Sequence, residues 1–305
     1  MTIPRRSFIA ATAAAAIAGP AFARGRRGDA PFRLALKYGM IQPGDSIEAK
    51  LRIARDAGFE GVEIPSPSNL PLDELTAAAN ATGVEIPGVV NSVHWRDTLG
   101  DPDGAVRARG VTAMETAIRD CATVGGSTVL LVPAVVNDRI TYAQAWERSI
   151  DAIRGVAPQA ERAGVMIAIE NVWSNFLLSP LEAARYVDEC NAGFAEPVVG
   201  WYLDIGNLWN TAWPEHWIEA LGERIVRLDI KGYSRKKADA EGKWKGFGVP
   251  IDGGDLDWSR VRSALDAAGL RGHGMWATAE VGGGDARRLN EIAQRMRRAL
   301  GIEGS

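Results

Sequence analysis

Four apolar segments in the second half of the chain each lead into a carboxylate. Residues 166–169, 200–203, 225–228 and 274–279 precede, in that order, Glu170, Asp204, Asp229 and Glu280. Four carboxylates that meet in one place would repel one another unless a cation neutralised them. A single acid at a strand end is usually a helix cap or an ion-pair partner, but independent capping does not explain four in succession. Because hard divalent ions prefer oxygen ligands, the pattern predicts a metal site.

Lys231 follows the third of these acids by two residues. If 225–230 is a strand, alternation places Arg227, Asp229 and Lys231 on one face. Lys231 is then expected to offset the carboxylate charge or to bind an oxygen of a substrate. A structural salt bridge with Asp229 or Asp204 is the alternative, and the sequence leaves both open.

The segments that carry these residues belong to a regular alternation that begins after Ala30. Strand-like runs at 32–36, 61–64, 85–90, 128–132, 165–169, 198–203, 225–230 and 274–279 alternate with helical patterns at 47–57, 72–81, 105–124, 142–163, 181–191, 214–221, 258–268 and 285–300. Apolar strands separated by helices favour a parallel sheet covered on both faces. Eight such units predict an α/β protein with a closed (β/α)8 TIM barrel. An open doubly wound sheet is the alternative, but no Gly-x-Gly-x-x-Gly or P-loop motif follows the first strand.

Four short motifs give the sequence a family resemblance. They are AGFEGVE at 57–63, IEN at 169–171, LDIGN at 203–207 and GGDLDW at 253–258. With them the chain resembles the sugar phosphate isomerase/epimerase-like barrels of the xylose isomerase superfamily, over nearly all of 24–305. The resemblance implies that the carboxyl ends of strands five to eight bind a divalent metal, often Mn²⁺. The matching positions are Glu170, Asp204, Asp229 and Glu280.

The resemblance also implies roles for individual residues. Glu170 and Glu280 would remove and return a proton on opposite faces of a carbohydrate, while Lys231 and Arg235 would hold its oxygens. Asp229 stands where the family usually has His, so an all-carboxylate site would favour Mn²⁺ or Mg²⁺ over Zn²⁺. Asn207 stands where ketose epimerases often have a substrate-binding His, which weakens the transfer of any particular ketose-epimerase activity.

Several other residues are secondary candidates for the site. Glu63, which closes the second strand, is expected to bind substrate or to pair with Lys37. His94 closes the third strand, and it either lines the sugar site or has a structural role. Three tryptophans near the site segments suit either stacking against sugar faces or core packing, namely Trp173, Trp201 and Trp209. The long stretch 232–257, rich in Lys, Gly and Trp, is expected to be a lid or binding loop.

The first 23 residues have the pattern of an export signal and not of a barrel element. A twin arginine at 5–6, an Ala-rich apolar run and the motif AFA at 21–23 are typical of a twin-arginine export signal. An uncleaved anchor or an Ala-rich tail is the alternative, although the run is too short and weakly apolar for a good membrane span. We therefore expect a signal peptide at 1–23, a mature chain at 24–305, and a periplasmic or secreted protein.

Composition narrows the functions further. The net charge of −3 does not favour binding to nucleic acid, which needs a basic surface. Three histidines are too few for a His-rich metal centre such as that of DNA repair endonucleases. Cys121 and Cys190 are expected to be buried small residues rather than a disulfide. The sequence does not determine whether the chain forms a homo-oligomer.

Three functions remain open from the sequence. Metal-dependent isomerisation or epimerisation of a carbohydrate through an enediolate is the first. β-Elimination or hydrolysis of a 3-keto-glycoside on the same metal site is the second, and a non-catalytic carbohydrate-binding barrel is the third. A phosphorylated sugar is a poor candidate for the substrate, because export would separate the protein from cytosolic sugar phosphates. The segment GGG at 282–284 is the nearest candidate for a phosphate-binding loop, and it is better explained as a turn.

Overall fold

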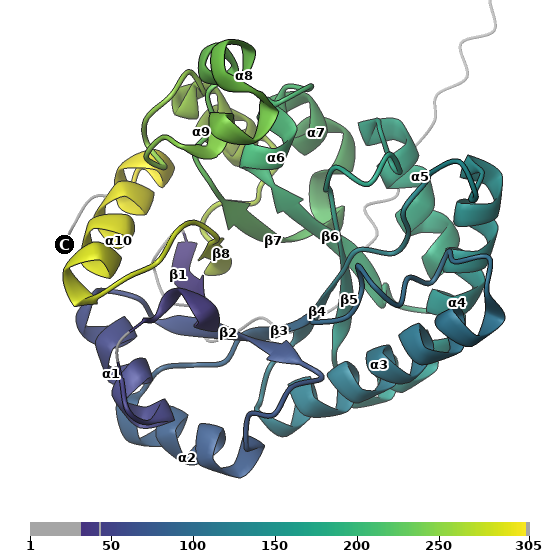
Figure 1. The fold of residues 1–305 in the computed structure, drawn as a ribbon, viewed down its shortest axis with the longest axis horizontal. Coiled ribbons are helices and arrows are strands. Elements are labelled where there is room, and N and C mark those ends of the chain that lie inside the picture. Colours follow the sequence, from purple (N-terminus) through teal and green to yellow (C-terminus); the bar gives the residue numbers. More distant parts are fainter. Residues whose placement is uncertain (1–31, 43, 303–305) are drawn as a thin grey trace, which may run out of the picture.

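Eight parallel strands form a closed barrel in chain order in the computed structural model, which describes residues 32–42 and 44–302. The strands are β1 Phe32–Lys37, β2 Gly61–Ser66, β3 Gly88–Asn91, β4 Thr128–Leu131, β5 Met166–Glu170, β6 Val199–Asp204, β7 Ile225–Ile230 and β8 Met275–Ala279. β1 pairs with β8 and closes the ring, which is visible along the barrel axis in Figure 1. The predicted (β/α)8 barrel is confirmed.

Helices surround the barrel (Figure 1). Their bounds are α1 Ile47–Asp56, α2 Leu72–Thr82, α3 Gly104–Thr123, α4 Tyr142–Ala163, α5 Pro180–Asn191, α6 Ile205–Trp209, α7 Pro214–Leu221, α8 Arg235–Glu241, α9 Trp258–Ala267 and α10 Ala286–Leu300. No helix among the described residues is long and apolar enough to cross a membrane. The predicted signal peptide at 1–23 lies outside the described residues.

Local sequence signals set the ends of the helices. The long helix α4 begins at a capping box, in which the Thr141 hydroxyl accepts from the Gln144 N–H and the Gln144 side chain accepts from the Thr141 N–H. It ends at Gly164, whose φ of 65° is left-handed and therefore suits glycine. Cys121 and Cys190 are buried and unbonded to each other, as expected.

Two segments differ from the sequence-based expectation. The third strand begins at Gly88 instead of residue 85, since Pro87 has no N–H for a sheet ladder and Glu85 makes only an isolated bridge with Gly61. The stretch 232–257 is also more ordered than a structureless loop, because it folds into α8 and a short 3-10 segment, η3 (Lys243–Phe247). These elements lie beyond the carboxyl end of β7.

Alternation along the strands separates two environments. The large hydrophobic core lies between the strands and the helices. A smaller cluster of Leu130, Ala168 and Tyr202 fills the inside of the barrel. On β7, Arg227 donates to Thr128 Oγ1 near the amino-terminal end of the barrel, and Asp229 lies on the same interior face nearer the mouth. The fold therefore directs the polar residues of the strand ends into one mouth.

Candidate metal centre and active site

The four strand-ending carboxylates meet at the carboxyl end of the barrel. Glu170, Asp204, Asp229 and Glu280 each offer one oxygen, and these atoms all lie within 4.8 Å of one another. The first three residues are buried, whereas the side chain of Glu280 is 44% exposed. Because β6 and β7 separate β5 from β8 in the barrel, Glu170 and Glu280 approach the centre from different sides. The cluster is thus a buried acidic pocket with one open edge.

Asn171 fixes the position of Asp204. Its side-chain oxygen accepts from the Asp204 N–H at 3.0 Å, and its side-chain nitrogen donates to the Asp204 carbonyl at 2.8 Å. Asp204 in turn caps α6, since its Oδ1 accepts from the Asn207 N–H at 2.8 Å. The IEN and LDIGN motifs therefore meet in space, and their amides hold the Asp204 carboxylate in place.

Lys231 bridges two of the carboxylates. Its Nζ lies 2.7 Å from Asp204 Oδ2 and 2.5 Å from Glu280 Oε2. Gly206 permits this approach, because a Cβ at that position would lie 2.6 Å from the Lys231 Cβ. The salt bridge of Lys231 with Asp204 is confirmed, and a contact of its ammonium group with a substrate oxygen stays a prediction.

A second cation, Lys37 on β1, also contacts the cluster. Lys37 Nζ is 3.2 Å from Asp229 Oδ2 and 2.8 Å from Glu63 Oε2. Glu63 also accepts a hydrogen bond from the Tyr202 hydroxyl at 2.9 Å. The contact of Lys37 with Asp229 and the role of Tyr202 were not predicted from the sequence. Tyr202 stands two residues before Asp204, so strand alternation places both side chains on the same face, and this spacing could have identified Tyr202 as a residue of the barrel interior.

Burial and charge set the protonation of the cluster. Burial, together with repulsion from the other carboxylates, raises the pKa of Glu170 and Asp229 well above their ordinary values. Burial likewise raises the pKa of Asp204, less strongly because an ammonium group lies beside it. Burial also acts to raise the pKa of Glu280, but two lysine ammonium groups outweigh it and lower that pKa to about 2. A further cation beside these carboxylates would oppose the rise in the pKa of Glu170, Asp204 and Asp229 and so favour their ionised forms.

The donor set fits a hard divalent cation. Asp229 is fully buried among three other carboxylates, and Lys37 Nζ, 3.2 Å from its Oδ2, supplies one positive charge. Buried carboxylates in excess of the cations beside them are costly unless a further cation binds. Glu170, Asp204 and Glu280 complete an all-oxygen set of the kind that Mn²⁺ and Mg²⁺ prefer.

His94 is buried close to the cluster and is uncharged. Its Nδ1 accepts a hydrogen bond from the Val132 N–H at 3.2 Å. Burial, with a smaller contribution from Lys37, lowers the pKa of His94 to about 4. The bond to Val132 is a structural role and leaves the proton of the neutral ring on Nε2. A contact of His94 with substrate stays a prediction.

Arg235 lies apart from the carboxylates. Its guanidinium donates to the carbonyl oxygens of Trp209 and Ala212 and stacks over the Trp209 ring, with 4.1 Å between Cζ and the ring centre. Asp255 of the GGDLDW motif accepts from the Arg235 N–H and from Trp209 Nε1. In this arrangement Arg235 and Asp255 anchor α8, and a contact of Arg235 with substrate stays a prediction.

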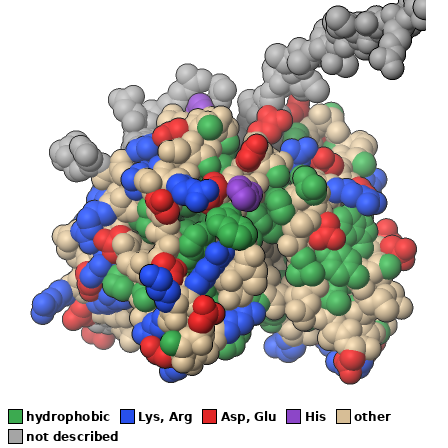
Figure 2. Space-filling view, turned by 90° about the horizontal axis from the view of Figure 1, so that it is seen from above, with side chains coloured by type: hydrophobic (Ala, Val, Ile, Leu, Met, Phe, Trp, Pro, Cys, Tyr) green, Lys and Arg blue, Asp and Glu red, His purple; other side chains and the backbone are tan. Residues whose placement is uncertain are grey.

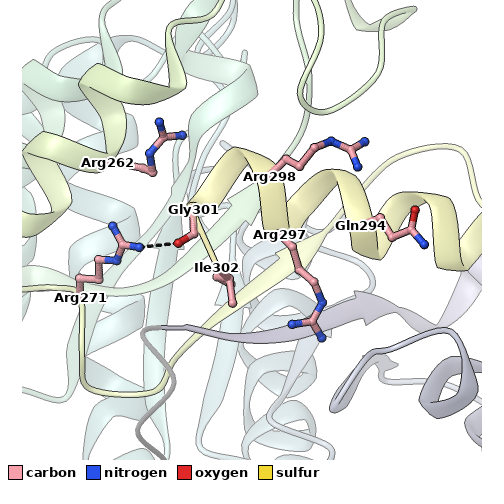
Figure 3. Close-up of a pocket in the computed structure, with 7 residues that line it drawn as sticks. All are labelled: Arg262, Arg271, Gln294, Arg297, Arg298, Gly301 and Ile302. Carbon is pink, nitrogen blue, oxygen red and sulfur yellow. Dashed lines mark hydrogen bonds between the residues drawn. The ribbon is translucent and has the colours of Figure 1, made fainter. Parts of the chain in front are cut away.

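A separate pocket of about 720 Å³ lies at the other end of the barrel (Figure 3). Arginines line this pocket, and two of them donate hydrogen bonds to backbone carbonyl groups of the chain itself. Arg262 donates to the Ala299 carbonyl and Arg271 to the Gly301 carbonyl. These contacts cap the last turn of α10, and we assign the pocket no role. Figure 2 shows acidic and basic side chains mixed on one face of the molecule rather than a basic stripe.

Similarity to known proteins agrees with the geometry. The family model of the xylose isomerase-like TIM barrel matches residues 51–299. L-ribulose-5-phosphate 3-epimerase UlaE of Escherichia coli K12 is 28% identical, covering 87% of this chain and 95% of its own.

Two solved structures share the fold. L-ribulose 3-epimerase has a TM-score of 0.73 at 18% identity, covering 88% of this chain and 95% of its own. The 3-keto-D-glucoside 4-epimerase YcjR of E. coli has a TM-score of 0.71 at 16% identity, covering 89% and 100%. The relative UlaE is a sugar epimerase, which is an isomerase, and it confirms the predicted enzyme class. The two solved structures show the shared fold. The chain belongs to the xylose isomerase-like TIM barrel family.

Proposed function

We propose that this protein is a metal-dependent sugar isomerase or epimerase that removes a proton from a carbon beside a carbonyl group. The observation that carries the proposal is the convergence of four carboxylates within 4.8 Å, two of them on different sides of the barrel mouth. A non-catalytic sugar-binding barrel has no need of such a costly charge cluster.

Glu170, Asp204, Asp229 and Glu280 would hold the metal, and Mn²⁺ is the ion that we propose. When bound, the metal would supply a positive charge that polarises the sugar carbonyl and stabilises negative charge developing beside it. Asp204 and Asp229 are placed to hold an ion, because both are fully buried and fixed on strand ends.

Glu170 and Glu280 would move the proton. The Glu280 side chain lies at the open edge of the cluster and is partly open to solvent, so its carboxylate is accessible to a C–H group of a bound sugar, from which it would remove the proton. Glu170 ends β5, on another side of the centre from Glu280, and from there it would return a proton to the sugar. Return of a proton to the opposite face gives an epimer, and return to the neighbouring carbon gives an isomer.

Lys231, Asn207 and His94 would position the sugar. The Lys231 ammonium stands between Asp204 and Glu280, where it would bind a substrate oxygen. Glu63 would act indirectly, because its oxygens are used by Lys37 and Tyr202. If the carbon beside the reacting C–H carries a leaving group, the same proton removal gives β-elimination, as in the alternative reaction on a 3-keto-glycoside.

Metal content and hydrogen exchange test the proposal. The wild type should bind Mn²⁺ close to one per chain and exchange a sugar C–H with D₂O, as NMR would record. Glu170→Gln and Asp204→Asn should lose both, whereas Asp97→Asn, a buried acid outside the cluster, should keep both. A wild type that binds none of Mn²⁺, Mg²⁺ and Zn²⁺ would overturn the proposal, and product analysis would separate epimerisation from elimination.

We also propose that residues 1–23 direct export by the twin-arginine route. The charged start, the Ala-rich run and the AFA motif support it. Changing both arginines at 5–6 to lysine should keep the protein in the cytoplasm at its full mass. Unaltered export of that variant would contradict the proposal.

A further inference from the structure

An aromatic cluster borders the carboxylate centre. Trp173 follows β5, Tyr233 follows β7, and Trp244 and Phe247 belong to η3. The Trp173 ring lies 5.1 Å from Phe247 in a stacked arrangement and 4.6 Å from Trp244, measured between ring centres. Tyr233 contacts Phe247 edge-on at 4.8 Å. The four rings therefore form one continuous aromatic cluster, in which Tyr233 is fully buried and Trp244 is exposed.

The cluster begins at the reacting centre and extends outward to solvent. Lys231 Nζ lies 5.9 Å from the Phe247 ring centre and 2.7 Å from Asp204 Oδ2. At its other end, the Trp244 side chain is 72% exposed. A ligand held at the carboxylates would thus meet Phe247 first, and any extension of it in this direction would reach Trp244.

The cluster is held in place by polar contacts. The Tyr233 hydroxyl lies 2.9 Å from both Asn210 Oδ1 and the Lys243 carbonyl oxygen. Gly246 packs directly on the Tyr233 ring, since a Cβ there would lie 2.5 Å from its atoms. Because η3 is fixed in this way, the Trp244 ring is presented to solvent on an ordered element, and little ordering is needed on binding.

The chemistry of the surface indicates its ligand. An exposed aromatic ring beside a cation favours a partner with both an apolar face and polar groups at its rim. The cation here is the Lys243 ammonium, which lies 3.9 Å from the Trp173 ring centre. It can donate hydrogen bonds to polar groups at the rim of a ligand. A sugar ring has this character, with C–H groups on its face and hydroxyls around it.

The geometry points to a subsite for a second sugar unit on Trp244 and Phe247, so that the substrate is a glycoside rather than a free monosaccharide. The inference rests on the proposed function, which places the reacting sugar at the carboxylates. Phe247 would contact the bond between the two units, and Trp244 would stack against the second unit.

Binding of disaccharides tests the subsite without catalysis. Isothermal titration calorimetry of the full chain, in chelator and in Mn²⁺ buffer, would compare cellobiose, maltose and lactose with their constituent monosaccharides. We expect at least one disaccharide to bind tenfold or more tightly than its monosaccharides. Trp244→Ala should remove that gain, and Trp244→Phe should keep part of it. Trp213→Ala, the matched control, alters another exposed tryptophan outside the cluster and should keep all of it.

The outcomes separate the subsite from the proposed function. No gain for any of the disaccharides, or a gain that survives in Trp244→Ala, would overturn the subsite. If disaccharides bind through Trp244 but no sugar exchanges its C–H in D₂O, the subsite stands and the proposed reaction fails. If free sugars exchange as fast as glycosides in wild type and Trp244→Ala alike, the reaction stands and the subsite fails.

Discussion

Replacing Asp229 by Asn should stabilise the metal-free protein and weaken metal binding. The change removes one negative charge and keeps the size of the side chain. Asp229 is fully buried among three other carboxylates. Lys37 lies 3.2 Å away and keeps its ion pair with Glu63 in the variant. We therefore expect the Asp229 carboxylate to destabilise the metal-free fold and to contribute a ligand when a metal is bound.

The distances give the size of the effect. At an effective dielectric constant near 20, two ionised carboxylates 4.8 Å apart repel by about 3.5 kcal/mol, and one oxygen of each of the other three carboxylates lies within that distance of Asp229. The ion pair with Lys37 at 3.2 Å returns about 5 kcal/mol. Because uptake of protons relieves most of the remaining repulsion, we expect the free energy of unfolding of Asp229→Asn to rise by about 1–3 kcal/mol in chelator.

Urea unfolding with chelator and with Mn²⁺ measures both effects. Mn²⁺ at 1,000 times its dissociation constant stabilises the wild type by about 4 kcal/mol, and a hundredfold loss of affinity removes about 2.7 kcal/mol of that gain. Mn²⁺ should therefore cancel or reverse the stability advantage of the variant. Asp97→Asn, which breaks ion pairs with Arg96 and Arg109, should lose stability equally in both buffers. A variant less stable than the wild type in chelator would show that Asp229 is a structural partner of Lys37, and would refute the reasoning.

Three further predictions follow from the site. Lys231→Met leaves Asp204 and Glu280 without their shared cation, so stability in chelator should fall by about 3 kcal/mol and Mn²⁺ should restore most of it; an equal loss in both buffers in urea unfolding would contradict this. The pKa of His94 is about 4 in the folded chain and 6.5 in the unfolded chain, so between these values only the unfolded chain takes up the proton. His94 should then contribute a fall in stability of about 3 kcal/mol as pH drops from 6.5 to 4, measured as the difference between the urea unfolding of the wild type and of His94→Asn over this range; a difference that does not change with pH would contradict it. Gly206→Ala places a Cβ against Lys231 and should cost about 1–3 kcal/mol, whereas Gly155→Ala, where the added Cβ meets no atom within 4 Å, should not lower the melting temperature.

The sequence by itself determined the barrel and the acids at its mouth. Apolar strands that alternate with helical patterns fix the direction of every strand, because a short loop and a helix return the chain to the same edge. An acid that directly follows such a strand must then lie at the carboxyl end of the barrel. For this reason the sequence alone predicts that Glu170, Asp204, Asp229 and Glu280 lie together, as they do in the fold.

Tertiary structure alone decided which side chains touch. Lys37 meets Asp229 because β1 closes against β8, and Tyr202 reaches Glu63 across the barrel although 139 positions separate them in the chain. Such contacts depend on the register between strands, which the hydrophobic pattern of a single strand does not encode. The path of 232–257 was likewise undetermined, since the contacts of Arg235 and Trp244 depend on how α8 and η3 pack, and short polar segments carry no periodicity from which that packing follows.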